Sequence, residues 1–171
     1  GATAHVEPCD VGDQEAVAAL VERVTERYGT PDILVNNAGV GIWRAVEETE
    51  PGYVVEAMSV PYFAAFWTTR GFLPAMLDRG SGHVVVINSA VAWLDMPGAT
   101  AYRAARWALR AFAESLYGEL YDSPVDVTQA VFGEVTSEYF RNNPGSHERL
   151  PSINAIYRTL SPDEAGRLTL K

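Results

Sequence analysis

The sequence predicts an α/β fold built on a doubly wound parallel sheet. Three short apolar runs rich in valine and isoleucine lie at residues 32–35, 83–87 and 125–131, and such runs are typical of strands covered on both faces. Long helical patterns lie between them, at residues 51–77 and 100–121. This alternation of strands and helices is the pattern of a doubly wound parallel sheet.

A further helix is predicted near the start of the chain, after a mildly β-prone segment at residues 3–8. Asp13 can cap this helix, and Gly29 is suited to end it. Its apolar side chains recur at offsets of three, four and seven residues, which is the spacing of one helix face. These side chains are Val17, Leu20, Val21 and Val24.

The regular hydrophobic pattern of the chain ends after Val131. Residues 133–160 have little periodicity and contain an Asn-Asn-Pro-Gly run at 142–145, which predicts a long loop with one or two short helices. Ser161-Pro162 then marks another helix start. Loops longer than about 12 residues are usually functional or disordered, so a substrate lid and a disordered segment both remain open. Residues 1–171 are otherwise expected to form a single domain.

Composition excludes several classes of protein. The 171 residues carry a net charge of −9, which would repel a phosphate backbone, so nucleic acid is not an expected partner. No apolar run approaches the roughly 20 residues that span a bilayer, and no basic-then-apolar signal is present. The single thiol, Cys9, favours a reducing, cytoplasmic location. The three histidines are dispersed, so no metal site is expected; they are His5, His83 and His147.

Ser89, Tyr102 and Arg106 form the strongest candidate constellation. Ser89 follows the strand at residues 83–87, where open α/β sheets bind ligands, and Tyr102 and Arg106 lie four residues apart on one helix face. A carbonyl bound there would accept a hydrogen bond from Ser89 and a proton from Tyr102, while Arg106 supplies positive charge. The alternative from spacing alone is that Tyr102 packs in the core and Arg106 extends to solvent.

Several segments together resemble the short-chain dehydrogenase/reductase family. They are Asp-Ile-Leu-Val-Asn-Asn-Ala-Gly at residues 32–39, Gly-Ser-Gly-His-Val-Val-Val-Ile-Asn-Ser at 80–89 and Pro-Gly-Ala-Thr-Ala-Tyr-Arg-Ala-Ala-Arg at 97–106. Residues 9–11 resemble the adenine-contacting Asp segment of the family, and residues 131–136 resemble its nicotinamide loop. The resemblance covers nearly the whole chain and keeps the order and spacing of the family.

This resemblance implies an NAD(P)-dependent oxidoreductase that transfers hydride between a nicotinamide cofactor, NAD or NADP, and an apolar alcohol or ketone. Tyr102 would be the acid/base, Ser89 would orient the substrate oxygen, and Arg106 would stand in place of a lysine that holds the ribose. The implied cofactor-binding residues are Asp10, Val11, Asn37, Ala38, Gly39, Tyr102, Arg106, Gly133 and Val135. The implied substrate contacts are Val91, Trp93, Met96 and Phe132. A homo-oligomer through the helices at residues 62–77 and 107–121 is also implied.

Four departures from the family pattern bear on activity. Arg106 replaces the lysine, and Lys171 is the only lysine of the chain. Pro61 falls where the family has an asparagine, which predicts either a kinked helix or a break between two helices. Phe132 replaces a proline, which is a minor change. The Gly-rich phosphate motif is missing, so we expect negligible cofactor affinity for the 171 residues alone. A catalytically silent binding protein of the same fold is the alternative function.

Relative to the family, the predicted Rossmann-like sheet is incomplete, because its first two strands and its last strand are missing. Either the sequence is a fragment of a longer chain or its first strand is displaced. In both cases residues 3–8 would lack a sheet neighbour, and residues 33–35 would form an exposed apolar edge. Gly39-Val40-Gly41 does not replace the phosphate motif, because Arg44 stands where a third glycine belongs. Neither the substrate nor the choice between NAD and NADP follows from the sequence.

Overall fold

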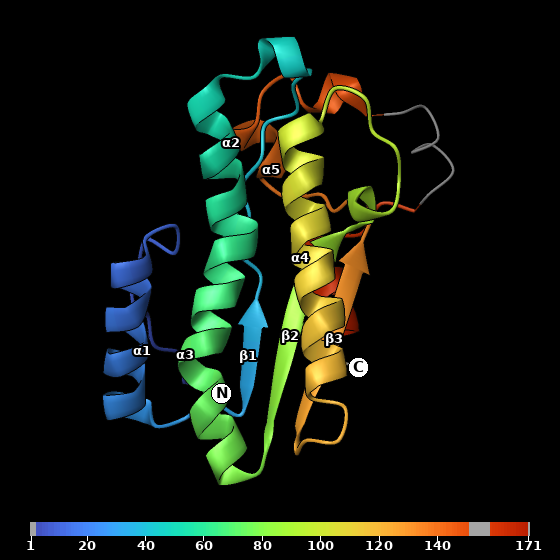
Figure 1. Cartoon of the computed structure of the whole chain (residues 1–171). Helices are drawn as coiled ribbons and strands as arrows, with labels where there is room; N and C mark the ends of the chain where they lie inside the picture. Colours follow the sequence, from blue (N-terminus) through green and yellow to red (C-terminus); the bar gives the residue numbers. More distant parts are fainter. Residues whose placement is uncertain (1–2, 151–157, 171) are drawn as a thin grey trace.

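Three parallel strands form one sheet in the part of the chain that the structure describes. The computed structural model describes residues 3–150 and 158–170. In it, β1 (Ile33–Asn36), β2 (Gly82–Ser89) and β3 (Val125–Phe132) lie side by side in that order (Figure 1). The predicted parallel sheet is therefore confirmed, with strands at three of the expected runs, whereas the β-prone residues 3–8 form no strand.

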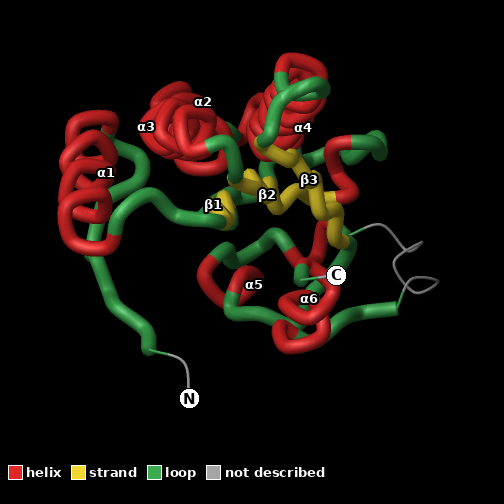
Figure 2. Tube along the Cα trace, turned by 90° about the horizontal axis from the view of Figure 1, so that it is seen from below, coloured by secondary structure: helices red, strands yellow, loops and turns green. Residues whose placement is uncertain are grey.

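Helices cover the two faces of this sheet unequally. Figure 2 shows α3 (Ala64–Arg79) and α4 (Thr100–Glu119) over one face, and the short α5 (Tyr139–Asn142) and α6 (Pro162–Thr169) on the opposite side. α1 (Gln14–Tyr28) lies beyond β1 and packs against α3. The main core lies between the sheet and its two long helices. Its largest buried members are Phe72, Met76, Val84, Val86, Leu109, Leu116, Leu120 and Val125.

Pro61 lies in an irregular turn of an otherwise continuous helical run. α2 (Pro51–Met58) leads through a π-helical turn at Ser59–Phe63 into α3, and Pro61 is buried within that turn. Proline lacks the N–H that an α-helix interior requires, and the wider π turn absorbs the mismatch. The alternative of a break between two helices is therefore wrong, and the irregularity falls where the proline predicts it.

The predicted helix ends are also confirmed. Asp13 Oδ1 accepts hydrogen bonds from the backbone N–H groups of Glu15 and Ala16, at 2.8 and 3.2 Å, and caps α1. Gly29 ends the helix with φ of 81°, a left-handed value that favours glycine. Ser161 forms a capping box with Glu164 at the start of α6.

The structure confirms both consequences expected from a sheet without its first two strands. Residues 3–8 belong to no strand. In β1, which is an edge strand, Ile33 and Val35 are 53% and 47% exposed. An exposed apolar edge of this kind is normally covered in a complete sheet.

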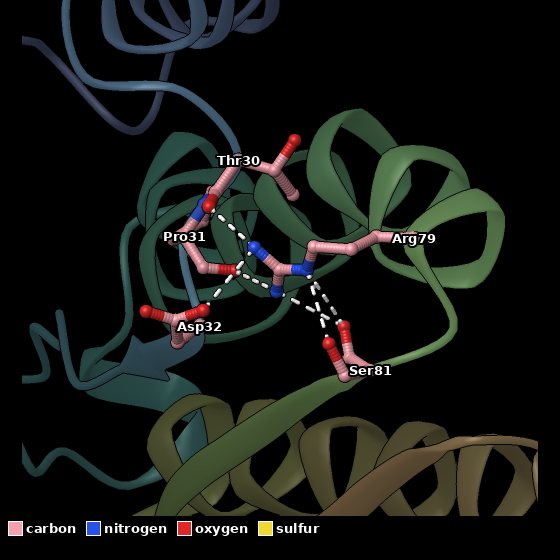
Figure 3. Close-up of polar contacts among 5 residues, drawn as sticks. All are labelled: Thr30, Pro31, Asp32, Arg79 and Ser81. Carbon is pink, nitrogen blue, oxygen red and sulfur yellow. Dashed lines mark hydrogen bonds and ion pairs between the residues drawn. The ribbon is translucent and has the colours of Figure 1, made fainter.

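Arg79 joins three chain segments at the amino-terminal end of the strands (Figure 3). Its guanidinium donates to the carbonyls of Thr30, Pro31 and Ser81 at 2.8, 2.9 and 3.0 Å. Nε also donates to Ser81 Oγ at 3.1 Å, and Asp32 pairs with Nη1 at 3.2 Å. The planar fork of one side chain thus ties the end of α3 to the segments that enter β1 and β2.

We expect Arg79→Lys to destabilise the fold almost as much as Arg79→Ala, because an ammonium cannot serve this set of acceptors. Hydrogen bonds to a charged donor contribute about 1.5–3 kcal/mol where they are well formed, so a loss of about 2 kcal/mol in the free energy of unfolding is expected. Urea unfolding measures it. Arg141→Lys is the control, since Arg141 is exposed and pairs only with Glu138. If Arg79→Lys were as stable as the parent chain, the planar guanidinium of Arg79 would not be needed for stability.

Candidate active site

A cavity of about 1020 Å³ opens at the carboxyl ends of the strands. Ligands of open α/β sheets bind at this edge. The segments after β1, β2 and β3 line the cavity, together with α4, α5 and α6. The side chains that the sequence brought forward as catalytic all line it, and they are Ser89, Tyr102 and Arg106.

Ser89 is the last residue of β2, and its hydroxyl is free to donate. Its Oγ accepts a hydrogen bond from Val91 N at 3.3 Å, so the hydroxyl proton remains available to a ligand oxygen. Asn88 is 2% exposed and fixes this end of the strand. Its Oδ1 accepts from Ser89 N at 2.8 Å, and its Nδ2 donates to the Arg106 carbonyl at 3.2 Å. The asparagine amide therefore connects β2 to α4 beside the site.

Tyr102 and Arg106 lie one turn apart on α4 and are both buried, with exposures of 5% and 8%. The guanidinium carbon of Arg106 lies 5.2 Å from the centre of the Tyr102 ring. Both side chains line the cavity. Because Arg106 is buried, the alternative in which it extends into solvent is wrong.

The Arg106 guanidinium has unused donors. Nη1 donates to the Ile87 carbonyl at 3.3 Å, whereas Nε has no hydrogen-bond partner among the described residues. Within residues 3–150 and 158–170, no carboxylate forms an ion pair with this side chain. Burying such a group is costly unless an acceptor reaches it. The arrangement therefore suits a ligand rich in hydroxyl or other acceptor oxygens.

Two glycines after β1 make room for these two side chains. A methyl group on Gly39 would lie 2.5 Å from Arg106 Nη2, and one on Gly41 would overlap the Tyr102 ring at Cδ2. The Gly39-Val40-Gly41 segment therefore packs its backbone against the site. The sequence shows the two glycines, but only the fold shows which side chains lie against them.

The implied cofactor and substrate residues divide into two groups. The cavity lining includes Asn37, Gly39, Val91, Met96, Phe132, Gly133 and Val135. Asp10, Val11 and Ala38 do not line it, and Asp10 Oδ1 instead accepts from Gly12 N at 2.9 Å.

Trp93 does not contact the cavity, which corrects the expectation for this residue. It is 41% exposed, and the guanidinium carbon of Arg110 lies 4.5 Å from its ring centre. This stacking directs the indole toward a smaller pocket that Tyr117 also lines.

Residues 133–160 contain two short helical segments, as expected. They are α5 and a 3₁₀ turn at His147–Arg149. Ser146 Oγ accepts from Trp43 N at 3.0 Å, so this segment packs against the loop that follows β1. The rest of the expected loop, residues 151–157, lies outside the described residues.

Sequence reasoning missed Tyr139 and Trp43. Tyr139 Oη donates to the Gly41 carbonyl at 2.7 Å and accepts from Trp43 Nε1 at 3.1 Å. Burial raises the pKa of Tyr139 above its ordinary value, and the neighbouring Tyr102 raises it further. No local pattern could have found this pair, because almost a hundred residues separate the partners.

Two negative findings apply to the described residues alone. None of their helices has the length and apolar character needed to cross a bilayer. They also hold no group of three or more histidine, cysteine, aspartate or glutamate side chains that could bind a metal ion.

Known proteins similar to this chain are dehydrogenases and reductases. The chain is 33% identical over its whole length to human "Short-chain dehydrogenase/reductase 3" and covers 55% of that protein. It is 38% identical over 66% of its length to human "Retinol dehydrogenase 10", of which it covers 33%. The chain thus spans about half the length, or less, of the curated relatives it matches.

Solved structures agree with these relatives. A putative NAD(P)-dependent gluconate 5-dehydrogenase from Beutenbergia cavernae with bound NADP matches 99% of this chain and 70% of its own, with a TM-score of 0.87 and 29% identity. An alcohol dehydrogenase from Thermococcus sibiricus complexed with 5-hydroxy-NADP matches 95% of this chain and 65% of its own, with a TM-score of 0.79 and 27% identity.

The family model described as short chain dehydrogenase matches residues 1–146. That match covers most of the chain and includes the end of β2, which carries Ser89, and the helix α4, which carries Tyr102 and Arg106. The chain therefore belongs to the short-chain dehydrogenase/reductase family.

Proposed function

We propose that this chain carries the catalytic and substrate-binding part of an NAD(P)-dependent oxidoreductase that interconverts an apolar alcohol and its ketone or aldehyde. One observation supports this most strongly. Ser89, Tyr102 and Arg106, from two different elements, meet at one cavity at the carboxyl end of the sheet. Membership of the family makes hydride transfer the expected chemistry of such a site.

Each of the three side chains has a distinct role in this proposal. Ser89 donates its free hydroxyl proton to the substrate oxygen and orients it. Tyr102 gives that oxygen a proton during reduction and removes it during oxidation. Arg106 supplies a fixed positive charge, with its guanidinium carbon 5.2 Å from the centre of the Tyr102 ring, and stabilises negative charge that develops on the reacting oxygen.

The residues present fit a nicotinamide cofactor next to Arg106. The unpartnered Arg106 Nε needs an acceptor, and the absence of a side chain at Gly39 leaves the guanidinium its place at the cavity. Asn37, Gly133 and Val135 line the same cavity. When bound there, a nicotinamide would supply or accept the hydride. Cofactor-bound relatives include both an NADP complex and a 5-hydroxy-NADP complex.

The proposed substrate is apolar because apolar side chains line part of the cavity. Met96 and Val91 are 8% and 7% exposed and belong, with Trp43, to a second core cluster at the cavity. Leu150 packs against that cluster and also lines the cavity. The name of one relative, "Retinol dehydrogenase 10", refers to an apolar alcohol.

The alternative function is a catalytically silent binding protein of the same fold. It is favoured by Pro61, which cannot supply the asparagine side chain of the family, and by the arginine at position 106. Both functions predict the same fold, so only turnover and its dependence on Tyr102 separate them.

Tyr102→Phe is expected to reduce turnover by about 100-fold or more, because it removes the proton donor and leaves the ring in place. Steady-state oxidation of apolar alcohols is the measurement, made on this chain with the Gly-rich phosphate-binding segment of a relative fused before Gly1. Tyr121→Phe is the matched control, since Tyr121 is 73% exposed. Turnover that is indifferent to Tyr102→Phe would contradict the proposal. Absent turnover in a chain that binds no cofactor by calorimetry would favour the silent alternative.

Arg106→Met should cost about 100-fold in turnover, because a preorganised charge beside the acid/base is lost. Arg106→Lys keeps the charge, and its turnover should stay within about tenfold of the parent. The melting temperature of each variant separates loss of chemistry from loss of fold. If Arg106→Met turned over as fast as the parent, Arg106 would have no electrostatic role.

We also propose that the protein is a homo-oligomer through α3 and α4. Large aromatic side chains on these helices are exposed, with exposures of 45% for Phe66, 43% for Trp107 and 56% for Tyr117. Exposed aromatic clusters commonly mark interfaces.

Sedimentation velocity tests this arrangement. Phe66→Arg is expected to shift the protein to the monomer, because it places a charge in the buried face. Val6→Arg, at a position that is 85% exposed and away from the two helices, is the control. A monomeric parent chain at all concentrations would contradict the proposal.

A further inference from the structure

Tyr139 reaches from α5 to the loop that follows β1 and holds two of its groups. The Tyr139 hydroxyl donates to the Gly41 carbonyl at 2.7 Å and accepts from the Trp43 indole Nε1 at 3.1 Å. The Tyr139 hydroxyl therefore uses its one proton and one acceptor lone pair within the protein. Burial and the nearby Tyr102 raise the pKa of Tyr139, so the hydroxyl keeps the proton that it donates to Gly41.

Other contacts hold the same loop in place from two directions. On the α5 side, Trp43 N donates to Oγ of Ser146, a fully buried residue, at 3.0 Å. Asn143 Nδ2 donates to the Tyr139 carbonyl at 2.6 Å and ties the Tyr139 backbone to the same segment. On the α2 side, Ile42 N donates to the Tyr53 hydroxyl. Residues 41–43 are thus fixed between α2 and the α5 segment.

The position of this loop bounds the ring of Tyr102. The Gly41 backbone lies so close that a methyl group there would be 2.8 Å from Cε2 of Tyr102 and would overlap Cδ2. The rings of Trp43 and Tyr139 lie 5.7 and 6.0 Å from the Tyr102 ring, centre to centre. A shift of Gly41 or of the indole therefore changes the space that the Tyr102 ring occupies.

We propose that Tyr139 is a positioning residue for Tyr102, acting through the Gly41 carbonyl and the Trp43 indole. The proposal rests on the acid/base function proposed for Tyr102. It assigns to the segment after β3 a task other than contact with substrate, namely the alignment of the proton donor. An error of about 1 Å in such an alignment is enough to reduce a rate by about 100-fold, so the hydrogen bonds of one hydroxyl matter.

The first test needs no turnover and uses the 171-residue chain. Tyr139→Phe keeps the ring and removes both hydrogen bonds, so ring-current effects on neighbours change only if the geometry changes. Nuclear magnetic resonance of the ¹⁵N-labelled indoles and of ¹³Cζ-labelled tyrosines is the measurement. The variants Trp43→Phe and Tyr102→Phe identify the signals of these two residues, because each variant loses one signal. The Trp43 indole and Tyr102 signals should both shift or double in Tyr139→Phe. In the control Tyr121→Phe they should not move.

The second test uses the fused, active form described above. Tyr139→Phe should lower kcat by about 10- to 100-fold and leave the KM for the cofactor within about twofold, since the hydrogen bonds that it removes go to Gly41 and Trp43 and not to Asn37, Gly133 or Val135. In a Tyr102→Phe background, Tyr139→Phe should cause no further loss, because both changes act on one step. A merely structural role would lower the residual rate again.

The outcomes separate the two proposals. If the Tyr102 signal is unchanged in Tyr139→Phe, or kcat is unchanged while Tyr102→Phe abolishes turnover, the positioning role is wrong and the proposed function stands. If Tyr102→Phe leaves turnover intact, the proposed function is wrong, and a positioning role for Tyr139 in catalysis falls with it. In that case a shifted Tyr102 signal would show only that Tyr139 orders the loop.

Discussion

The close approach of the backbone at residues 39–41 to α4 is the constraint on which the site depends. Gly39 lies against the Arg106 guanidinium and Gly41 lies against the Tyr102 ring. Because no side chain stands between them, the Arg106 guanidinium and the Tyr102 ring are buried under backbone. A side chain at either glycine would move the group below it or push the loop away from α4.

Burial under this loop also explains the unusual state of Arg106. The side chain is 8% exposed, donates to one carbonyl and leaves Nε without a partner among the described residues. Burying a cation whose donors lack acceptors costs free energy. A ligand that supplies acceptors to these donors reduces that cost. Asn88, which bonds the Arg106 carbonyl, keeps the helix backbone in register with β2 while the side chain serves the cavity.

The amino ends of the strands hold stabilising contacts, whereas their carboxyl ends hold the cavity. At the amino end, Arg79 binds carbonyls of the two segments that enter β1 and β2 and contributes to stability. At the carboxyl end, β1 and β2 stop at the polar residues Asn36 and Ser89, and the cavity opens between the loops. Pro61 lies in the helical run that packs beside α4, and its π-helical turn shows that the chain accommodates the proline without interrupting that run.

The sequence alone determined the strands, the long helices, the helix caps and the trio Ser89, Tyr102 and Arg106, because hydrophobic period, capping residues and motif spacing are local properties. It also predicted the exposed edge at β1. It did not determine that Trp93 stacks on Arg110 outside the cavity, that Gly41 lies on Tyr102, or that Tyr139 bonds Gly41 and Trp43. Only the tertiary structure decided these contacts, because each joins segments whose meeting depends on how the loops pack across the sheet rather than on any neighbouring residue.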